Sequence, residues 1–474
     1  MRIRFAAVAT ATAAGLALAL LGSGCASSAK PATPAASKCE GTLGLEAGPG
    51  AVVTEVYAGG PAAAAGIQLK DVVLKIGDAA IQYDCDVDKA AFNRACQPVK
   101  VVVRRGGAEL DLTLTPVDQI AFLTKACIDG NPSACFRDAW LQWDRSQNAP
   151  DLFATACNGG SGEACAYQGL QLSEKSDTLS QALPVLERAC ELRSGSGCAT
   201  FGFLYATGKS VTKDDKKATA LYRKSCELGD AQGCYNAGLM ADSGRGTKED
   251  AAKAAADYEK ACDLGSSTGC TNLGFLYERG RGVKEDRARA VALYQRGCDG
   301  SSCSASNLGG CVNVGRAYRD GIGVAKDAAK AAEIFRAACE RRDSQQDDPQ
   351  AVTNGARACS LLGGLLIAGD GIPKDMEHGR DFSILGCDRG DAFGCFNAAV
   401  CFNSGSDTDP AKAASYFDRA CKLGDGESCH ELAVAYQNGK GVEKNAGMAT
   451  ALEKQACELG FAASCPKPKP KKKS

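Results

Sequence analysis

The chain has 474 residues with 55 basic and 56 acidic side chains, so its formal net charge is -1. This length exceeds one compact core and favours several domains or a repeat, and the balanced charge argues against a general nucleic-acid binder. The 26 cysteines indicate an oxidising compartment and a disulfide framework. Zinc fits them less well, because C-x2-C spacings are absent and there are only two histidines.

The N-terminus reads as a signal peptide. Arg2 and Arg4 precede an apolar run over 5–21, and small residues follow up to Cys25. The box LGSGC resembles a bacterial lipoprotein signal, although Gly22 replaces the usual larger aliphatic residue. The resemblance implies lipidation at Cys25, and Ala26 after it implies an outer-membrane lipoprotein facing the periplasm. Ordinary secretion with cleavage near Cys25 is the alternative, and a surface or secreted location is also open.

A small β-rich domain is predicted to follow a flexible, proline-containing tether over 26–38. Short β-branched or alternating runs at 51–56, 72–76, 99–103 and 109–115 are separated by glycine-rich turns and predict strands. One helix is expected over about 88–96. We place this domain at 39–117.

A helical repeat is predicted over 118–465. The pattern C-x7-C recurs along this region. From Cys190 to Cys298, the first cysteines of successive pairs lie 36 residues apart, a period typical of a helical solenoid. Two further pairs fit if their loops carry insertions. The predicted disulfide pairs are Cys127/Cys135, Cys157/Cys165, Cys190/Cys198, Cys226/Cys234, Cys262/Cys270, Cys298/Cys311, Cys339/Cys359, Cys387/Cys395, Cys421/Cys429 and Cys457/Cys465.

Other positions recur with the cysteines. A small residue stands four positions after the second cysteine, as at Gly202 and Gly238, and a large apolar residue stands four before the first, as at Tyr222 and Tyr258. The i, i+4 spacing puts that ring and the cysteine on one buried helix face. We expect two helices per repeat and a disulfide across each turn into the next repeat, because eight residues within one straight helix would separate the cysteines by ~12 Å.

Residues 118–465 resemble Sel1-like repeats, relatives of tetratricopeptide repeats, and in particular the cysteine-rich subclass of secreted Helicobacter proteins. The resemblance implies an all-α right-handed solenoid of disulfide-linked helix-turn-helix units. It also implies that the protein acts as an adaptor, which holds partners on a concave surface. Members of this subclass have also been described as penicillin-binding or β-lactamase-like, which gives the alternative function of a cell-wall protein.

Residues 39–117 resemble a bacterial PDZ domain, on the segments GTLGL, AVVTEV and GGPAAAAGIQLKDVVLKIGDAAI. The resemblance implies that the loop of Leu43, Gly44 and Leu45 presents backbone N–H groups to the terminal carboxylate of a peptide, while the next strand pairs with the peptide. Glycine suits such a loop because the ligand approaches the backbone closely.

Residues for catalysis are scarce. His430 occupies a position where other repeats carry Tyr235 or Thr271, and His378 lies in a turn-like segment without a recurring acid or nucleophile. The S-x-x-K match at Ser210 falls in a repeat turn without KTG or SDN motifs. We therefore expect no catalytic residue, no metal and no cofactor.

Five cysteines besides Cys25 have no partner by pattern: Cys39, Cys85, Cys96, Cys303 and Cys401. The basic end, 466–474, is expected to be a disordered tail. Together these features predict an envelope-anchored adaptor whose PDZ-like domain binds C-terminal peptides and whose repeats bind a second protein.

Overall fold

The structure is a computed structural model, which describes residues 41–42, 45–48, 52–56, 61–76, 79–81, 99–114, 117–128, 130–131, 134–136, 138–139, 149–174, 178–299, 308–340, 349–404 and 408–465. The signal segment with Cys25, the tether, the tail and the predicted helix over 88–96 lie outside these residues. So do Leu43, Gly44, Cys39, Cys85, Cys96 and Cys303.

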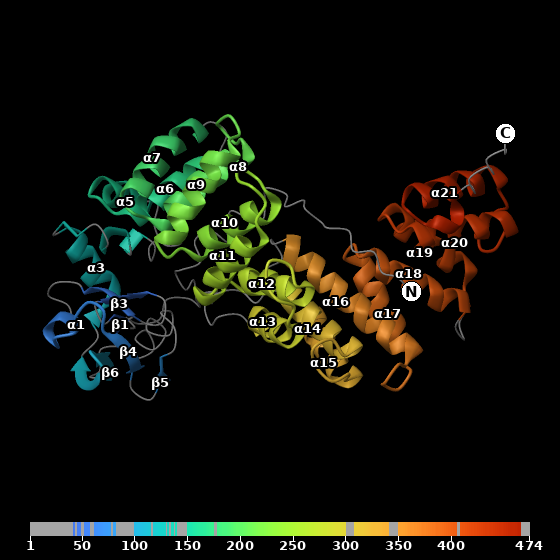
Figure 1. Ribbon diagram of the computed structural model, residues 1–474, viewed down its shortest axis with the longest axis horizontal. Helices are drawn as coiled ribbons and strands as arrows, with labels where there is room; N and C mark the ends of the chain where they lie inside the picture. Colours follow the sequence, from blue (N-terminus) through green and yellow to red (C-terminus); the bar gives the residue numbers. More distant parts are fainter. Residues whose placement is uncertain are drawn as a thin grey trace. The chain divides into compact units, whose positions relative to one another are not determined.

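The N-terminal part is an antiparallel sheet (Figure 1). Among the described residues the strand order is β2-β3-β4-β6-β7, with β5 paired to β4, and β1 pairs separately with β8. A short helix, α1 (Pro61–Ala64), lies between β3 and β4. The strands are β1 (Gly41–Thr42), β2 (Leu45–Gly48), β3 (Val52–Val56), β4 (Val72–Ile76), β5 (Ala79–Ala80), β6 (Val99–Arg105), β7 (Ala108–Leu114) and β8 (Val117–Asp118).

The pairing of β6 with β7 shows why this sequence forms a sheet. Val99, Val101 and Val103 are buried while the residues between them are more exposed, as the alternation of side chains along a strand requires. Their hairpin turns at Gly106 and Gly107, whose φ angles of 58° and 90° favour glycine. The valines join Val53, Ile76 and other apolar residues in one core.

One ion pair fixes the loop before β4 to the end of β6. Arg105 donates to both carboxylate oxygens of buried Asp71, at 2.8 and 2.7 Å. The hydrogen bond from Arg105 holds the pKa of Asp71 below its ordinary value.

Helices make up the described chain from Gln119 to Glu458, with one 3-10 turn, Ala462–Ser464, after them. None of these helices is both long enough and apolar enough to span a membrane. They are α3 (Gln119–Ile128), α5 (Ala149–Asn158), α6 (Gly162–Glu174), α7 (Leu179–Glu191), α8 (Gly195–Thr207), α9 (Asp215–Glu227), α10 (Ala231–Ser243), α11 (Ala251–Asp263), α12 (Ser267–Arg279), α13 (Arg287–Asp299), α14 (Leu308–Asp320), α15 (Ala328–Glu340), α16 (Pro349–Ala368), α17 (Met376–Asp388), α18 (Ala392–Ser404), α19 (Pro410–Lys422), α20 (Gly426–Asn438) and α21 (Ala446–Glu458).

The chain divides into two compact units. The first contains the described residues up to Glu285, and the second contains Asp286–Asp299 and the described residues from Leu308 onward. The sheet and the described helices up to α12 belong to the first unit, and α13 to α21 belong to the second.

The caps of α10 and α11 show what sets the helix length. Asp230 and Asp250 accept hydrogen bonds from the backbone N–H groups three residues later, and so cap the two N-termini. Gly244 ends α10 in the left-handed conformation, with φ of 66°. The turn residues that recur in the sequence are therefore helix stop and start signals.

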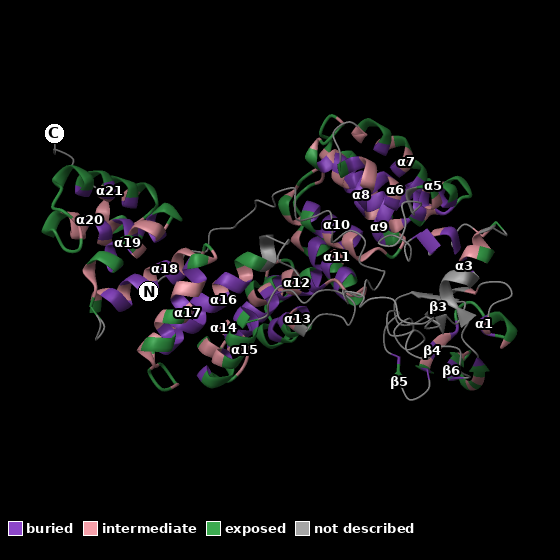
Figure 2. Ribbon diagram, turned by 180° about the vertical axis from the view of Figure 1, so that it is seen from behind, coloured by how far each residue is buried: buried purple, intermediate pink, exposed green. Residues whose placement is uncertain are grey.

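Within a repeat, the first helix packs against the second through an inner seam of glycines and rings. A Cβ built on Gly238 of α10 would lie 2.7 Å from the ring of Tyr258 in α11, and Gly202 meets Tyr222 in the same way. Gly315 faces Phe335 in the second unit. Both α10 and α11 contain buried residues (Figure 2), and Tyr258 is only 1% exposed. The recurring small residue thus makes room for the recurring ring.

Disulfides cross the turn from the second helix of one repeat into the first helix of the next. Each joins Cα atoms 4.4 to 4.8 Å apart, within disulfide reach. The structure contains Cys127–Cys135, Cys157–Cys165, Cys190–Cys198, Cys226–Cys234, Cys262–Cys270, Cys298–Cys311, Cys339–Cys359, Cys387–Cys395, Cys421–Cys429 and Cys457–Cys465.

Cys401 is a free thiol buried in α18. It lies six residues after Cys395, where α10 and α12 carry the buried side chains of Met240 and Leu276. Burial raises the pKa of its thiol. Cys401 therefore serves as a small apolar core residue.

Candidate functional site

The first helices of three consecutive repeats carry an apolar row on the side away from their own partner helices. We call Phe203 of α8, Leu239 of α10 and Phe275 of α12 the outer row; they lie 36 residues apart, each directly after a seam glycine. Successive helix residues point about 100° apart, so the outer row turns away from the seam. Leu239 is 37% exposed and Phe275 is 41% exposed, while Phe203 is half-buried.

Packing orders the three helices within the first unit. Helices α8 and α10 pack together (Figure 1), and α11 packs against both α10 and α12. Turn residues also form hydrogen bonds between repeats. Arg245 donates to the carbonyl oxygen of Ala206, and Arg281 donates to the carbonyl oxygen of Asp242, each at 3.0 Å. The outer row is therefore carried on a rigid support.

A polar residue stands three positions before each member of the outer row: Thr200, Asn236 and Asn272. Asn236 is only 6% exposed. Its Oδ1 accepts a hydrogen bond of 3.2 Å from Gln232 Nε2, but its Nδ2 has no hydrogen-bond partner among the described residues. Leaving a buried donor unpaired costs about 1 to 3 kcal/mol. Because the atom is buried, its missing partner is a cost that packing in this repeat must offset.

Charged residues flank the outer row. Asp242 and Glu278 stand three residues after Leu239 and Phe275, and Asp242 is paired with Arg281 at 3.0 Å. The guanidinium of Arg279 lies over the Phe275 ring at 4.8 Å. We use the name outer face for the outer row and the polar residues beside it. The outer face consists of Thr200, Phe203, Thr207, Gln232, Asn236, Leu239, Ser243, Thr268, Asn272, Phe275 and Arg279.

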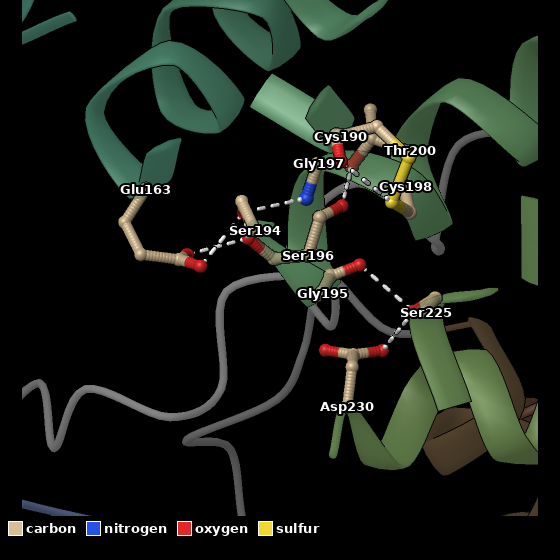
Figure 3. The surroundings of a disulfide bond; sticks show 10 residues. All are labelled: Glu163, Cys190, Ser194, Gly195, Ser196, Gly197, Cys198, Thr200, Ser225 and Asp230. Carbon is tan, nitrogen blue, oxygen red and sulfur yellow. Dashed lines mark hydrogen bonds between the residues drawn. A yellow bond between two sulfur atoms is a disulfide. The ribbon is translucent and has the colours of Figure 1, made fainter. Parts of the chain in front are cut away.

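A second polar cluster surrounds the Cys190–Cys198 disulfide (Figure 3). Glu163 of α6 accepts hydrogen bonds from Ser194 at 2.7 Å and Ser196 at 2.6 Å, and Ser194 also caps α8 by accepting from the Gly197 N–H. No histidine takes part in these contacts that could accept a serine proton. These hydroxyls cap and join helices.

The same cluster continues into the next repeat. Ser225 donates to the Gly195 carbonyl oxygen at 2.8 Å and contacts Asp230 at 3.1 Å (Figure 3). Burial raises the pKa of the Asp230 carboxyl above its ordinary value. The carboxylate stays in place because it caps α10.

The two histidines make local contacts. His430 lies beside Glu453 at 2.9 Å and Ser464 at 3.2 Å, the residue types of a Ser-His-Glu triad. Both contacts involve Nδ1, whereas proton relay requires the acid and the hydroxyl on opposite ring nitrogens. His378 is in α17 and not in a turn as the sequence suggested, because Asp375 caps that helix and accepts its backbone N–H.

The S-x-x-K match also lies in a helix connection. Ser210 has φ of 64° and takes the position of Gly246 in the following repeat. Lys213 pairs with Asp215 at 3.7 Å. Ser210 is thus a turn residue, and no contact joins it to a general base in the described chain.

For the predicted carboxylate loop, the structure describes only Leu45. It begins β2 and pairs with Val56 of β3. No group of three or more His, Cys, Asp or Glu side chains that could hold a metal occurs among the described residues. The outer face was not predicted from the sequence, although the large apolar residues directly after Gly202, Gly238 and Gly274 were a possible signal.

Comparison with known proteins identifies both parts of the chain. The PDZ domain profile matches residues 28–115, and the Sel1 repeat profile matches 199–230, 231–266, 267–302, 309–343, 356–391, 392–425 and 426–461. A curated relative, cytochrome c oxidase assembly factor 7 of Xenopus tropicalis, is 31% identical over 119 residues, covering 23% of this chain and 52% of that protein. The chain thus spans about half the length of this relative.

Solved structures of similar proteins include Helicobacter pylori cysteine rich protein B, 35% identical, covering 27% of this chain and 93% of that one with a TM-score of 0.23. A Sel1 repeat protein from Oxalobacter formigenes is 19% identical, covering 70% and 91% with a TM-score of 0.48. PDZ domains and Sel1 repeats support a role in protein–protein interaction, and the disulfides fit an extracytoplasmic location. The chain belongs to the Sel1 repeat family and carries a PDZ domain ahead of its repeats.

Proposed function

We propose that this protein is an envelope-anchored adaptor without catalytic activity that holds two protein partners at once, one on its PDZ domain and one on the outer face of its repeats. The observation that carries the proposal is the outer face itself. Leu239 and Phe275 are exposed at the same position of neighbouring repeats, and half-buried Phe203 takes that position in the repeat before them. Scattered exposed apolar residues need no explanation, but large apolar side chains at one repeated position are typical of an interaction surface.

The anchor is the lipid on Cys25, which would tether the PDZ domain (39–117) and the repeats (118–465) to the outer membrane facing the periplasm. Two observations support it: the LGSGC box, and disulfides that need an oxidising compartment. Replacing Cys25 with Ser should move the protein from the membrane fraction to the soluble periplasmic fraction. Retention in the membrane would contradict this part of the proposal.

The PDZ domain would bind C-terminal peptides through the loop of Leu43, Gly44 and Leu45. Backbone N–H groups that hold a carboxylate make charge-assisted hydrogen bonds of about 1.5 to 3 kcal/mol each. Amidating the peptide terminus, or replacing Gly44 with Val, should therefore weaken binding about tenfold or more. If amidated and free peptides bind equally, the domain is only a spacer.

The proposed binding surface on the repeats is tested by capturing partners from envelope extracts with the mature, oxidised protein. The double variant Leu239→Ser with Phe275→Ser should lose partners that the Gly44→Val variant keeps, since the two sites act independently. Leu192→Ser is the matched control, because Leu192 is 38% exposed in the same unit but lies at the end of α7. Equal capture by all variants would exclude the outer face as the binding surface.

A further inference from the structure

A pocket of about 90 Å³ lies in the second unit, where α19 packs against both α18 and α20 (Figure 1). Its apolar walls are formed by Ala413, Ala414 and Phe417 of α19 and by Val434 and Ala435 of α20. One water molecule needs only about 10 to 15 Å³ of such space. The pocket can therefore hold a group of several carbon atoms.

The corresponding space in the first unit is filled by larger side chains. Aligned on their cysteines, α19 and α20 match α11 and α12 residue by residue, so Val434 takes the position of Phe275 and Ala435 that of Leu276. Leu276 is 1% exposed and fills the space between the helices, whereas Ala435 is partly exposed. The carbon atoms that α12 supplies and α20 lacks are apolar, so an apolar group fits the pocket.

Contacts at the mouth hold the pocket in shape. Lys440, in the turn after α20, donates from Nζ to Asn403 Oδ1 of α18 at 2.6 Å. In the same turn Gly441 has a φ of 74°, and a Cβ there would overlap the carbonyl oxygen of Pro410 at the start of α19. The turn is thus fixed against both neighbouring helices. A ligand that enters a pocket of fixed shape does not have to order it first.

The rim of the pocket is polar and carries both signs of charge. It contains Glu431, Lys440 and the side-chain amides of Asn403 and Asn438. Such amides both donate and accept hydrogen bonds, and a peptide backbone offers one donor and one acceptor per residue. An apolar side chain inside the pocket can therefore stay attached to a peptide backbone at the rim.

The volume distinguishes between kinds of apolar side chain. An apolar cavity of about 150 Å³ holds benzene, and this pocket, at about 90 Å³, is smaller. A branched aliphatic group fits it better than a phenyl ring. The isobutyl group of Leu276, at the position of Ala435 in the sister repeat, has the same chemistry.

We propose that the pocket between α18, α19 and α20 binds a branched aliphatic side chain of a partner protein, whose backbone contacts the polar rim. The aliphatic group takes the space that Leu276 and Phe275 fill in the first unit. This site lies in the second unit, apart from the outer face and from the PDZ domain, so it goes beyond the function proposed above.

The test uses the full mature, oxidised protein and three small probes: N-acetyl-leucinamide, N-acetyl-asparaginamide and N-acetyl-phenylalaninamide. The leucine and asparagine side chains have nearly the same shape but opposite polarity, and none of the probes has the free carboxylate that the PDZ domain would bind. Saturation-transfer difference NMR titrations measure their dissociation constants. We expect millimolar binding of the leucine probe, at least tenfold tighter than that of the asparagine probe and tighter than that of the phenylalanine probe.

Variants assign the binding to the pocket. Val434→Phe with Ala435→Leu gives α20 the residues of α12 and should weaken binding of the leucine probe at least tenfold. Its urea midpoint should not fall, because filling a cavity tends to stabilise a protein. If the double variant unfolds, Ala435→Leu alone makes the same comparison. Val400→Phe is the matched control, since Val400 holds the position of Val434 in the preceding repeat but lies outside the pocket walls.

Several results would overturn the proposal. They are equal affinity for the leucine and asparagine probes, no binding of the leucine probe, and unchanged binding in the filled variant. Tighter binding of the phenylalanine probe would show that the pocket does not select an aliphatic group. If Leu239→Ser with Phe275→Ser abolishes binding of the leucine probe, the outer face holds the probe and the pocket does not. Partner capture by the outer face is measured separately, so failure of one site does not decide the other.

Discussion

The inner seam and the outer row are adjacent in the sequence and repeat with the same period, yet they differ in their surroundings. Gly238 lies under Tyr258, which is 1% exposed, whereas the next residue, Leu239, is 37% exposed. At Gly238 the seam has a facing ring, whereas the Leu239 side chain is open to solvent. Periodicity therefore shows that a residue belongs to a repeated surface, but an opposing side chain decides whether that surface is core.

The two surfaces should differ most in their effect on stability. Tyr258→Ala removes a ring that fills the seam over Gly238, and such losses cost about 3 to 5 kcal/mol. Leu239→Ala removes a half-exposed side chain and should cost less than about 1 kcal/mol. Urea unfolding followed by circular dichroism, with hydrogen exchange in α10 and α11, measures both, since repeat arrays can unfold in parts. Equal losses would show that Leu239 is core and would remove the basis for the outer face.

Removing a disulfide should come next in size. Cys226→Ala with Cys234→Ala opens a loop of about nine residues, for which chain entropy predicts a loss of about 2 to 3 kcal/mol. Cys226 lies one helix turn after Tyr222, on the seam side, so binding at the outer face should not change. The double alanine variant is compared with the oxidised parent in urea and in partner capture. Unchanged stability would mean that packing alone holds this turn.

A single methyl group on the seam should have a smaller effect. Gly238→Ala places a Cβ where the Tyr258 ring is 2.7 Å away, and such overpacking costs about 1 to 3 kcal/mol. Gly447→Ala in α21 is the control, because its Cβ would meet nothing closer than 3.4 Å. That change should stabilise by about 0.5 kcal/mol through the unfolded chain. If Gly238→Ala also stabilises, the seam is looser than its geometry indicates.

The repeated part of the fold could be predicted from the sequence because its cysteines, seam glycines and rings recur together. The short elements could not: α1, β1, β5 and β8 contain at most four residues each, too few to show a periodic pattern. His378 was misplaced because its helix begins at a cap, Asp375, within a glycine-rich segment. The outer row could not be predicted, because a phenylalanine or leucine at helical spacing is usually a core residue and the sequence alone does not show which side chains face it.

The polar residues beside the two surfaces allow the finest test. Asn236 and Asn397 occupy the same position of their repeats, two residues after the second cysteine, and both are buried. Asn397 donates to the Ser360 carbonyl oxygen at 3.2 Å, whereas Nδ2 of Asn236 has no partner in the described structure. The two amides should therefore differ in what they contribute to stability.

Asn397→Leu should therefore lower the free energy of unfolding by about 1 to 2 kcal/mol, since it deletes a bond and leaves the Ser360 carbonyl oxygen unpaired in the interior. Asn236→Leu removes a donor that is already unpaired, and its only lost bond is to Gln232, which is partly exposed to water. We expect a change within about 0.5 kcal/mol of zero, because the lost bond and the removed desolvation cost offset each other. Urea midpoints of the two variants measure the difference. If the two variants lose equal stability, the Asn236 amide contributes as much to the fold as the bonded amide of Asn397.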